Sequence, residues 1–103
     1  MNDISALEVK KKLDRKENFL LLDVRLPFEV KYSKIESSVN IPVKEIDNAL
    51  LKMDKSKEIV VYCHSGGRSA FATEYLIKKG FKAKNLAGGI IAYSEVDKKV
   101  KSY

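Results

Sequence analysis

The chain has 103 residues, of which 45% are hydrophobic and 33% charged, with 20 basic and 14 acidic side chains and a formal net charge of +6. This length and balance predict one globular domain spanning residues 1–103 and exclude a disordered chain. No apolar run approaches the roughly 20 residues of a membrane span, and the N-terminus shows no secretory signal pattern, so we expect a cytoplasmic protein without a membrane partner.

The basic excess consists of 17 lysines and three arginines, Arg15, Arg25 and Arg68. The lysines are scattered along what read as solvated helix faces and turns, whereas a nucleic-acid binder more often gathers arginine and aromatic side chains on one surface. We therefore expect no nucleic-acid partner. One cysteine, Cys63, with one histidine, His64, can form neither an internal disulfide nor a zinc site within one chain, so we expect no metal, no cofactor and a reducing compartment.

The first predicted element is a helix over residues 5–14. Ser5 and Glu8 have the spacing of a capping box, in which each side chain accepts a hydrogen bond from the other residue's backbone. The apolar spacing predicts that Leu7 and Leu13 face the core.

Further along, strands alternate with helices. Continuous apolar or β-branched segments predict strands that are covered on both faces. These strands are expected over residues 19–24, 39–42, 58–62 and 83–86, with helices over 26–32, 44–53 and 68–79, the last closed by Gly80, and a terminal helix after Gly88-Gly89.

This alternation predicts an α/β fold with a mainly parallel sheet. The working cleft of such a sheet lies beyond the carboxyl ends of its strands. Two predicted strands end there in polar or reactive groups, Asp23-Val24-Arg25 and Cys63-His64. Their convergence is the first indication of a functional site.

The segment from Cys63 to Ser69 lies between a predicted buried strand and an amphipathic helix. Gly66 and Gly67 can adopt positive φ angles, which would let successive backbone N–H groups converge as an anion-binding nest beside the helix N-terminus. A sulfur at the mouth of such a loop is expected to be a thiolate, the nucleophilic form of cysteine. The alternative is a buried structural cysteine at the end of a strand.

Other catalytic patterns do not fit this segment. Ser65 is not in a Gly-x-Ser-x-Gly elbow, because position 63 is cysteine, and no lysine follows Gly67 as a phosphate-binding P-loop requires. His64 could form a dyad with Cys63, but neighbouring side chains generally diverge, which favours a position at the rim.

Four blocks, taken together and in this order, resemble the single-domain rhodaneses. They cover the chain from about Ser5 to Tyr93 and read Leu22-Asp-Val-Arg25, Val39-Asn-Ile-Pro42, Ile59-Val-Val-Tyr-Cys-His-Ser-Gly-Gly-Arg-Ser69 and Leu86-Ala-Gly-Gly-Ile90. The resemblance implies a five-stranded parallel sheet with helices on both faces. It also implies a sulfurtransferase that carries sulfane sulfur as a cysteine persulfide from a small anionic donor such as thiosulfate to cyanide or a thiol, including one on a thioredoxin-like or sulfur-carrier protein.

The same resemblance assigns roles to individual residues. Cys63 becomes the persulfide carrier, and the backbone amides of residues 64–68 form its cradle, with Arg68 facing the anion or bracing the loop. Asp23 and Arg25 would support or flank the loop, or form only a structural ion pair. The cradle residues are His64, Ser65, Gly66, Gly67 and Arg68, and Ser69 is a further supporting residue.

The chain departs from the family pattern before Asn40. Ser33 and Ser37 stand where the family usually has glycine, and Lys34 stands for a histidine, which affects the local turn rather than the cysteine loop. Phosphatases of similar fold have five residues between cysteine and arginine, whereas four separate Cys63 from Arg68. The remaining alternative is a rhodanese fold that serves as a non-catalytic interaction or sulfur-relay module.

Overall fold

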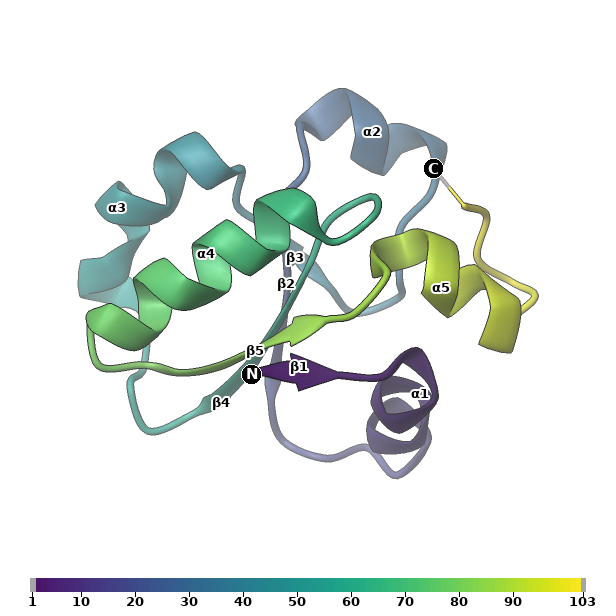
Figure 1. Ribbon diagram of the computed structural model, residues 1–103, viewed down its shortest axis with the longest axis horizontal. Coiled ribbons are helices and arrows are strands. Elements are labelled where there is room, and N and C mark those ends of the chain that lie inside the picture. The colour runs from purple at the N-terminus through teal and green to yellow at the C-terminus, as the bar shows by residue number, and fades with distance from the viewer. Residues whose placement is uncertain (1, 103) are drawn as a thin grey trace.

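Five parallel strands form a single sheet in the computed structural model, which describes residues 2–102 (Figure 1). The strands are β1 (Asp3–Ile4), β2 (Leu20–Asp23), β3 (Val39–Asn40), β4 (Glu58–Tyr62) and β5 (Lys82–Leu86). Their order across the sheet is β1-β5-β4-β2-β3, and every neighbouring pair is parallel. The predicted α/β fold with a five-stranded parallel sheet is confirmed.

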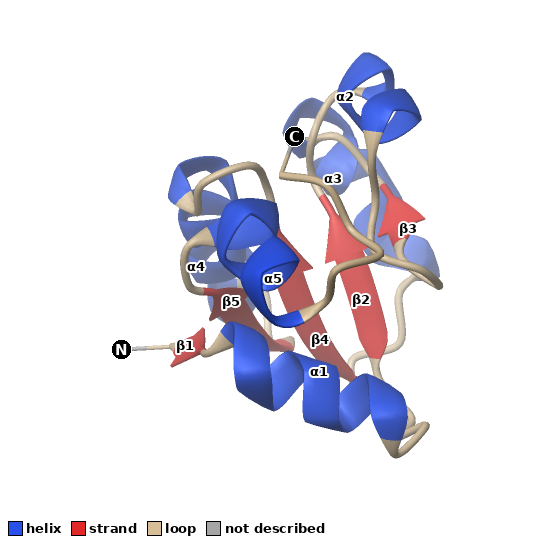
Figure 2. Cartoon of the chain, turned by 90° about the vertical axis from the view of Figure 1, so that its right-hand side faces the viewer, coloured by secondary structure: helices blue, strands red, loops and turns tan. Residues whose placement is uncertain are grey.

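The described residues also form five α-helices, which cover both faces of the sheet (Figure 2). They are α1 (Ala6–Asp14), α2 (Pro27–Tyr32), α3 (Ile46–Ala49), α4 (Gly67–Lys78) and α5 (Gly89–Val96). Helices α1 and α5 pack on one face, and α3 and α4 on the other. No helix within residues 2–102 is both long and apolar enough to cross a membrane.

The central strand β4 and its neighbour β2 bury side chains on both faces, as their continuous apolar sequences predicted. In β4, Val60 and Tyr62 face α1 and α5, whereas Ile59 and Val61 face α4. Cys63 continues this alternation and packs in the same cluster as Val61, below α4. Cys63, the residue that follows β4, is therefore buried in the core and does not lie on the surface.

The register of β2 against β4 brings the two predicted reactive segments together. Asp23 lies opposite Tyr62, and the backbone N–H of Val24 donates to the Tyr62 carbonyl at 3.0 Å. Because both strands point the same way, their carboxyl ends meet at one edge of the sheet, and Asp23 and Arg25 follow the same edge as Cys63.

The first predicted helix forms, with the Ser5 side chain accepting from the Glu8 N–H, but one predicted core residue was wrong. Leu7 is 53% exposed, and Ala6 and Val9 are buried in its place. Ala6, Val9 and Leu13 share the helix face that meets the sheet, because they are three and four residues apart. Leu7 lies one position, about 100°, away from that face.

Two other differences concern short elements. The predicted helix over 44–53 is broken into a 3₁₀ turn (Val43–Glu45), the one-turn α3 and a second 3₁₀ turn (Leu50–Lys52), none of which has a side-chain cap. Strand β1 has only two residues, too few for an alternation pattern, so the residue pattern alone missed it.

Candidate functional site

The sulfur of Cys63 lies beneath the loop that joins β4 to α4. Cys63 is 1% exposed and packs in the same cluster as Val61, so its sulfur is enclosed at the base of the loop and not at an open mouth. Its Sγ accepts hydrogen bonds from the Gly66 N–H at 3.1 Å, the Ser69 N–H at 3.4 Å and the Ser69 hydroxyl at 3.3 Å. The sulfur is thus enclosed by the polar groups of one turn.

These donors favour the charged form of the sulfur. Burial raises the pKa of the Cys63 thiol, but hydrogen bonds from Ser69 and from the backbone N–H groups of Gly66 and Arg68 outweigh it and hold the pKa below its ordinary value. A thiolate with a lowered pKa in this position is suited to nucleophilic attack.

The loop turns at a single glycine. Gly66 has φ +112°, a conformation that side chains rarely adopt, and it directs its N–H at the sulfur. The positive φ that we considered for Gly67 was wrong, because Gly67 is already the first residue of α4 and has room for a side chain. In the described loop, the amides of Gly66 and Arg68 donate to the sulfur, and those of His64, Ser65 and Gly67 do not.

The N-terminus of α5 supports the loop from below. Its N–H groups at Ile90 and Ile91 donate to the carbonyls of Cys63 and His64, at 2.9 Å and 3.2 Å. A Cβ atom at Gly89 would stand 2.6 Å from the Cys63 carbonyl oxygen and 2.4 Å from that of His64. Gly89 is therefore needed for this close approach, which gives the Gly-Gly-Ile block a structural role.

A series of polar side chains in mutual contact leads from the Cys63 sulfur across to β5. The fully buried Ser69 hydroxyl lies within hydrogen-bond distance of both Cys63 Sγ and the Oδ1 of Asn85, a β5 residue that is itself buried. Asn85 in turn reaches the carboxylate of Asp3 at 3.4 Å. Because Ser69 has one hydroxyl proton, Asn85 and the sulfur compete for it.

Asp23 and Arg25 form a fully buried ion pair beside the loop. Arg25 Nη2 donates to Asp23 Oδ2 at 2.7 Å, and its Nε donates to Asp23 Oδ1 at 3.0 Å. Arg25 Nη2 also donates to the Ser33 carbonyl at 2.7 Å, and Asn40 donates to the carbonyls of Asp23 and Arg25. We predicted that Asp23 and Arg25 would either support or flank the loop or form only a structural ion pair, and these contacts agree with the structural ion pair.

Among the described residues, the Arg68 guanidinium donates to no loop carbonyl, so the predicted bracing of the loop backbone is not seen. Its guanidinium extends to α2, where Nη1 and Nη2 donate to the two carboxylate oxygens of Glu29, at 2.6 Å and 2.9 Å. A guanidinium fork matches a carboxylate geometrically better than it matches a single carbonyl. Hydrogen bonding to Arg68 holds the pKa of Glu29 at about 2, although burial acts in the opposite direction.

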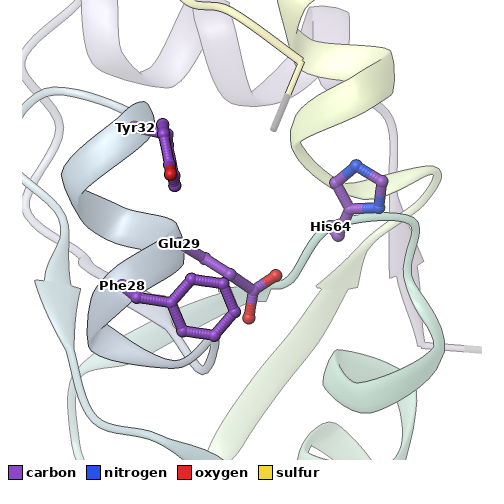
Figure 3. A pocket seen from close by; sticks show the side chains of 4 residues that line it. All are labelled: Phe28, Glu29, Tyr32 and His64. Carbon is purple, nitrogen blue, oxygen red and sulfur yellow. The ribbon is translucent and has the colours of Figure 1, made fainter.

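A pocket of about 450 Å³ opens between α2 and the loop. It is lined by Phe28, Glu29 and Tyr32 from α2 and by His64 from the loop (Figure 3). No hydrogen bond joins the His64 side chain to Cys63 among residues 2–102, and His64 contributes to the pocket wall instead.

The turn that departs from the family pattern includes a serine in a glycine-like conformation. Ser37 adopts φ +67°, the region that favours glycine, and the Ile35 N–H donates to the hydroxyl of buried Tyr62. The Ser33 hydroxyl donates to the Lys101 carbonyl at 2.8 Å. Serine thus replaces glycine here and gains contacts of its own.

Two side chains that contact residues of the site, Glu29 and Asn85, were not predicted from the sequence, whereas Gly89 was named there only within the Leu86–Ile90 block. Asn85 carried a usable signal, because a polar residue near the carboxyl end of a buried strand points to that functional edge. Glu29 carried none, since its partner Arg68 is 39 residues away.

Comparison with known proteins agrees with this geometry. The model of the rhodanese-like domain matches residues 5–95. A protein named sulfurtransferase from Allochromatium vinosum is 34% identical over 95 residues, which cover 91% of this chain and 89% of that protein. A tRNA uridine(34) hydroxylase of Pelagibacter ubique is 39% identical over 95 residues, covering 88% of this chain but 32% of that protein.

Among solved structures, a rhodanese-like domain protein from Staphylococcus aureus superposes with a TM-score of 0.88 at 30% identity, covering 100% of this chain and 99% of that one. The chain belongs to the rhodanese-like domain family, and proteins similar to it include sulfurtransferases.

Proposed function

We propose that the protein is a sulfurtransferase that moves sulfane sulfur from a donor such as thiosulfate to cyanide or a thiol, through a persulfide on Cys63. The observation that carries this proposal is the Cys63 sulfur, enclosed by donors from Gly66, Arg68 and Ser69 that lower its pKa. The relatives named sulfurtransferase support the same class of reaction.

The proposed chemistry needs only this chain and its two substrates. The Cys63 thiolate attacks the terminal sulfur of thiosulfate, a new S–S bond forms on Cys63, and the S–S bond of the donor breaks with release of sulfite. The acceptor then attacks the outer sulfur of the persulfide and leaves Cys63 as thiolate. Cyanide leaves as thiocyanate and a thiolate as a persulfide, so no cofactor or metal takes part.

We assign a different role in this reaction to each group of residues around Cys63. We assign the loop from His64 through Arg68 to the transferred sulfur and the bound anion, because its backbone encloses the thiol. Ser69 stabilises the thiolate through its amide and hydroxyl. The Asp23–Arg25 pair holds the neighbouring strand end in place.

We expect the acceptor to be a small thiol or a thiol on a thioredoxin-like or sulfur-carrier protein. Phe28 and Tyr32, exposed on α2 beside the loop, offer apolar contact area to such a partner. A thiol carrier works only where its single cysteine stays reduced, and for that reason we propose a cytoplasmic location.

Replacement of Cys63 tests the proposal. Cys63→Ser is expected to lose thiosulfate-to-cyanide transfer, because serine cannot hold sulfane sulfur as a persulfide. Wild-type protein mixed with thiosulfate is expected to gain the mass of one sulfur atom and to lose it after a reductant. Cys63→Ala, melted beside wild type, checks that the fold survives.

Turnover retained by Cys63→Ser would contradict this role of the cysteine. A folded wild-type protein with no sulfur adduct and no transfer would instead favour the non-catalytic interaction module.

A further inference from the structure

The cation closest to the loop is neutralised by a side chain from another element. Arg68 donates through both terminal nitrogens to both oxygens of Glu29, at 2.6 Å and 2.9 Å. The pair is only partly solvated, with Glu29 at 17% and Arg68 at 41% side-chain exposure. A bidentate pair of this kind occupies the fork that would otherwise bind an oxyanion.

Arg25, the second arginine of this region, is buried and paired inside the protein. Arg25 is fully buried and donates to the Asp23 carboxylate and to the Ser33 carbonyl. Both arginines near Cys63 within the described residues are therefore ion-paired. The pocket beside the loop is lined by an acidic side chain, Glu29, and by no arginine among the described residues.

The remaining wall is aromatic. Phe28, Tyr32 and His64 line the pocket of about 450 Å³ with Glu29, and its volume lies in the range of pockets that hold organic ligands, about 300–1,000 Å³. Thiosulfate has five heavy atoms and no apolar part, so it uses little of this surface.

We propose that Glu29 determines donor selectivity: by pairing with Arg68 it makes the site poor at binding the thiosulfate dianion and favours a singly charged persulfide on an organic body. This inference rests on the proposed function. With such a donor, the Cys63 thiolate attacks the terminal sulfur, the donor S–S bond breaks, and the organic thiolate leaves with the bonding electron pair. The organic body contacts Phe28 and Tyr32, and no free cation is needed.

Glu29→Gln tests the proposal with little change in shape. Glutamine keeps an oxygen that can accept from the Leu26 N–H, as Glu29 Oε1 does at 3.0 Å, but it removes the charge that neutralises Arg68. The KM for thiosulfate, with cyanide as acceptor, is expected to fall about three- to five-fold, the size of an exposed ion pair, with kcat little changed. The KM for benzyl persulfide, whose only charge is on its terminal sulfur, is expected to stay close to its wild-type value.

Three further variants isolate the cause. Glu29→Gln combined with Arg68→Gln is expected to abolish the gain, because the gain acts through the freed guanidinium. Glu29→Asp, one methylene shorter, is expected to lower the KM for thiosulfate less than Glu29→Gln does, and it provides a second measurement if the glutamine variant folds poorly. Glu17→Gln removes a surface ion pair with Lys12 and is expected to change neither KM.

Equilibrium binding separates this inference from the proposed function. In a Cys63→Ser background, where no transfer occurs, calorimetry is expected to show tighter thiosulfate binding when Glu29 is also glutamine. Unchanged or weaker binding would overturn the role of Glu29, even if Cys63 transfers sulfur. Tighter binding in a protein that never forms a persulfide would uphold the Glu29 effect on anion binding and overturn only the transfer reaction.

Discussion

The loop around Cys63 is held in different ways on its two sides. Toward α5 it is held by backbone alone, through the N–H groups of Ile90 and Ile91 and the close approach of Gly89. Toward α2 it is held by charged side chains, the partly exposed Glu29–Arg68 pair, while the buried Asp23–Arg25 pair secures the neighbouring end of β2 to the Ser33 carbonyl. The first side depends on the absence of a side chain and the second on the presence of several.

This difference means that one side of the loop fixes its location, whereas the other can change its binding properties. Backbone contacts with a glycine leave no side chain to vary, so the α5 side places the loop in one location. Ion pairs can be changed one residue at a time, so the α2 side can alter what the loop binds without moving it. Four variants test this contrast, and they are given from the largest expected effect to the smallest.

Asp23→Asn is expected to have the largest effect. It leaves the buried Arg25 charge without its carboxylate, and removal of one partner of a buried pair costs about 3–5 kcal/mol of unfolding free energy. Urea denaturation measures the loss. Asp14→Asn, which removes only a surface pair with Lys10, should lie within about 1 kcal/mol of wild type. Similar losses in the two variants would contradict the structural role of Asp23.

Gly89→Ala tests the backbone side. The new Cβ would lie 2.4 Å from the His64 carbonyl oxygen at a residue with φ +61°. Overpacking and the left-handed conformation together are expected to cost about 2–4 kcal/mol, with kcat lowered as the loop shifts. Gly67→Ala has open space and no positive φ, and its melting temperature should stay close to wild type. An equal loss in both variants would rule out the contact as the cause.

Ser69→Ala is expected to act on the thiol more than on the fold. It removes the hydroxyl that lies 3.3 Å from Cys63 Sγ, so the pKa of Cys63 rises. Alkylation by iodoacetamide at pH 7 is expected to slow by about five-fold, the value of one hydrogen bond of about 1 kcal/mol. Ser94→Ala, which loses only an exposed bond to the Ile91 carbonyl, serves as the control. An unchanged profile of rate against pH would show that the Ser69 hydroxyl does not stabilise the thiolate.

Glu29→Gln is expected to have the smallest effect on stability, and that effect depends on pH. The pKa of Glu29 falls from 4.5 to about 2 on folding, so the pair contributes fully above pH 4.5 and is lost as the pH falls through 2. Because Arg68 is 41% exposed, we expect about 1 kcal/mol at pH 7. Melting curves of the two proteins should converge near pH 2. A constant difference from pH 2 to 7 would contradict the ion pair as its source.

How well each feature could be predicted depends on how local its cause is. Strand β4 lies at residues 58–62 as predicted, since its β-branched residues are covered on both faces, and the helix after Cys63 begins within one residue of its predicted start. The side of α1 that faces the core was partly wrong, because Leu7 and Val9 are both apolar and only the sheet decides between them.

The side chains around the sulfur were harder to predict than the loop itself. The loop follows from local backbone preferences of Gly66 and from its place after a strand. The Glu29–Arg68 pair and the Ser69–Asn85 contact depend on rotamers of residues 39 and 16 positions apart, and no short pattern encodes them. The backbone of the site could thus be predicted from the sequence, and its charge balance could not.

The two bonds from α5 also limit how the loop could be redesigned. With the carbonyls of Cys63 and His64 anchored at Ile90 and Ile91, the first part of the loop cannot lengthen without breaking α5 away from it. An added residue would have to be inserted between Ser65 and Arg68, where Gly67 faces open space. A library of insertions restricted to that stretch would explore wider anion cradles while keeping the thiol in its original place.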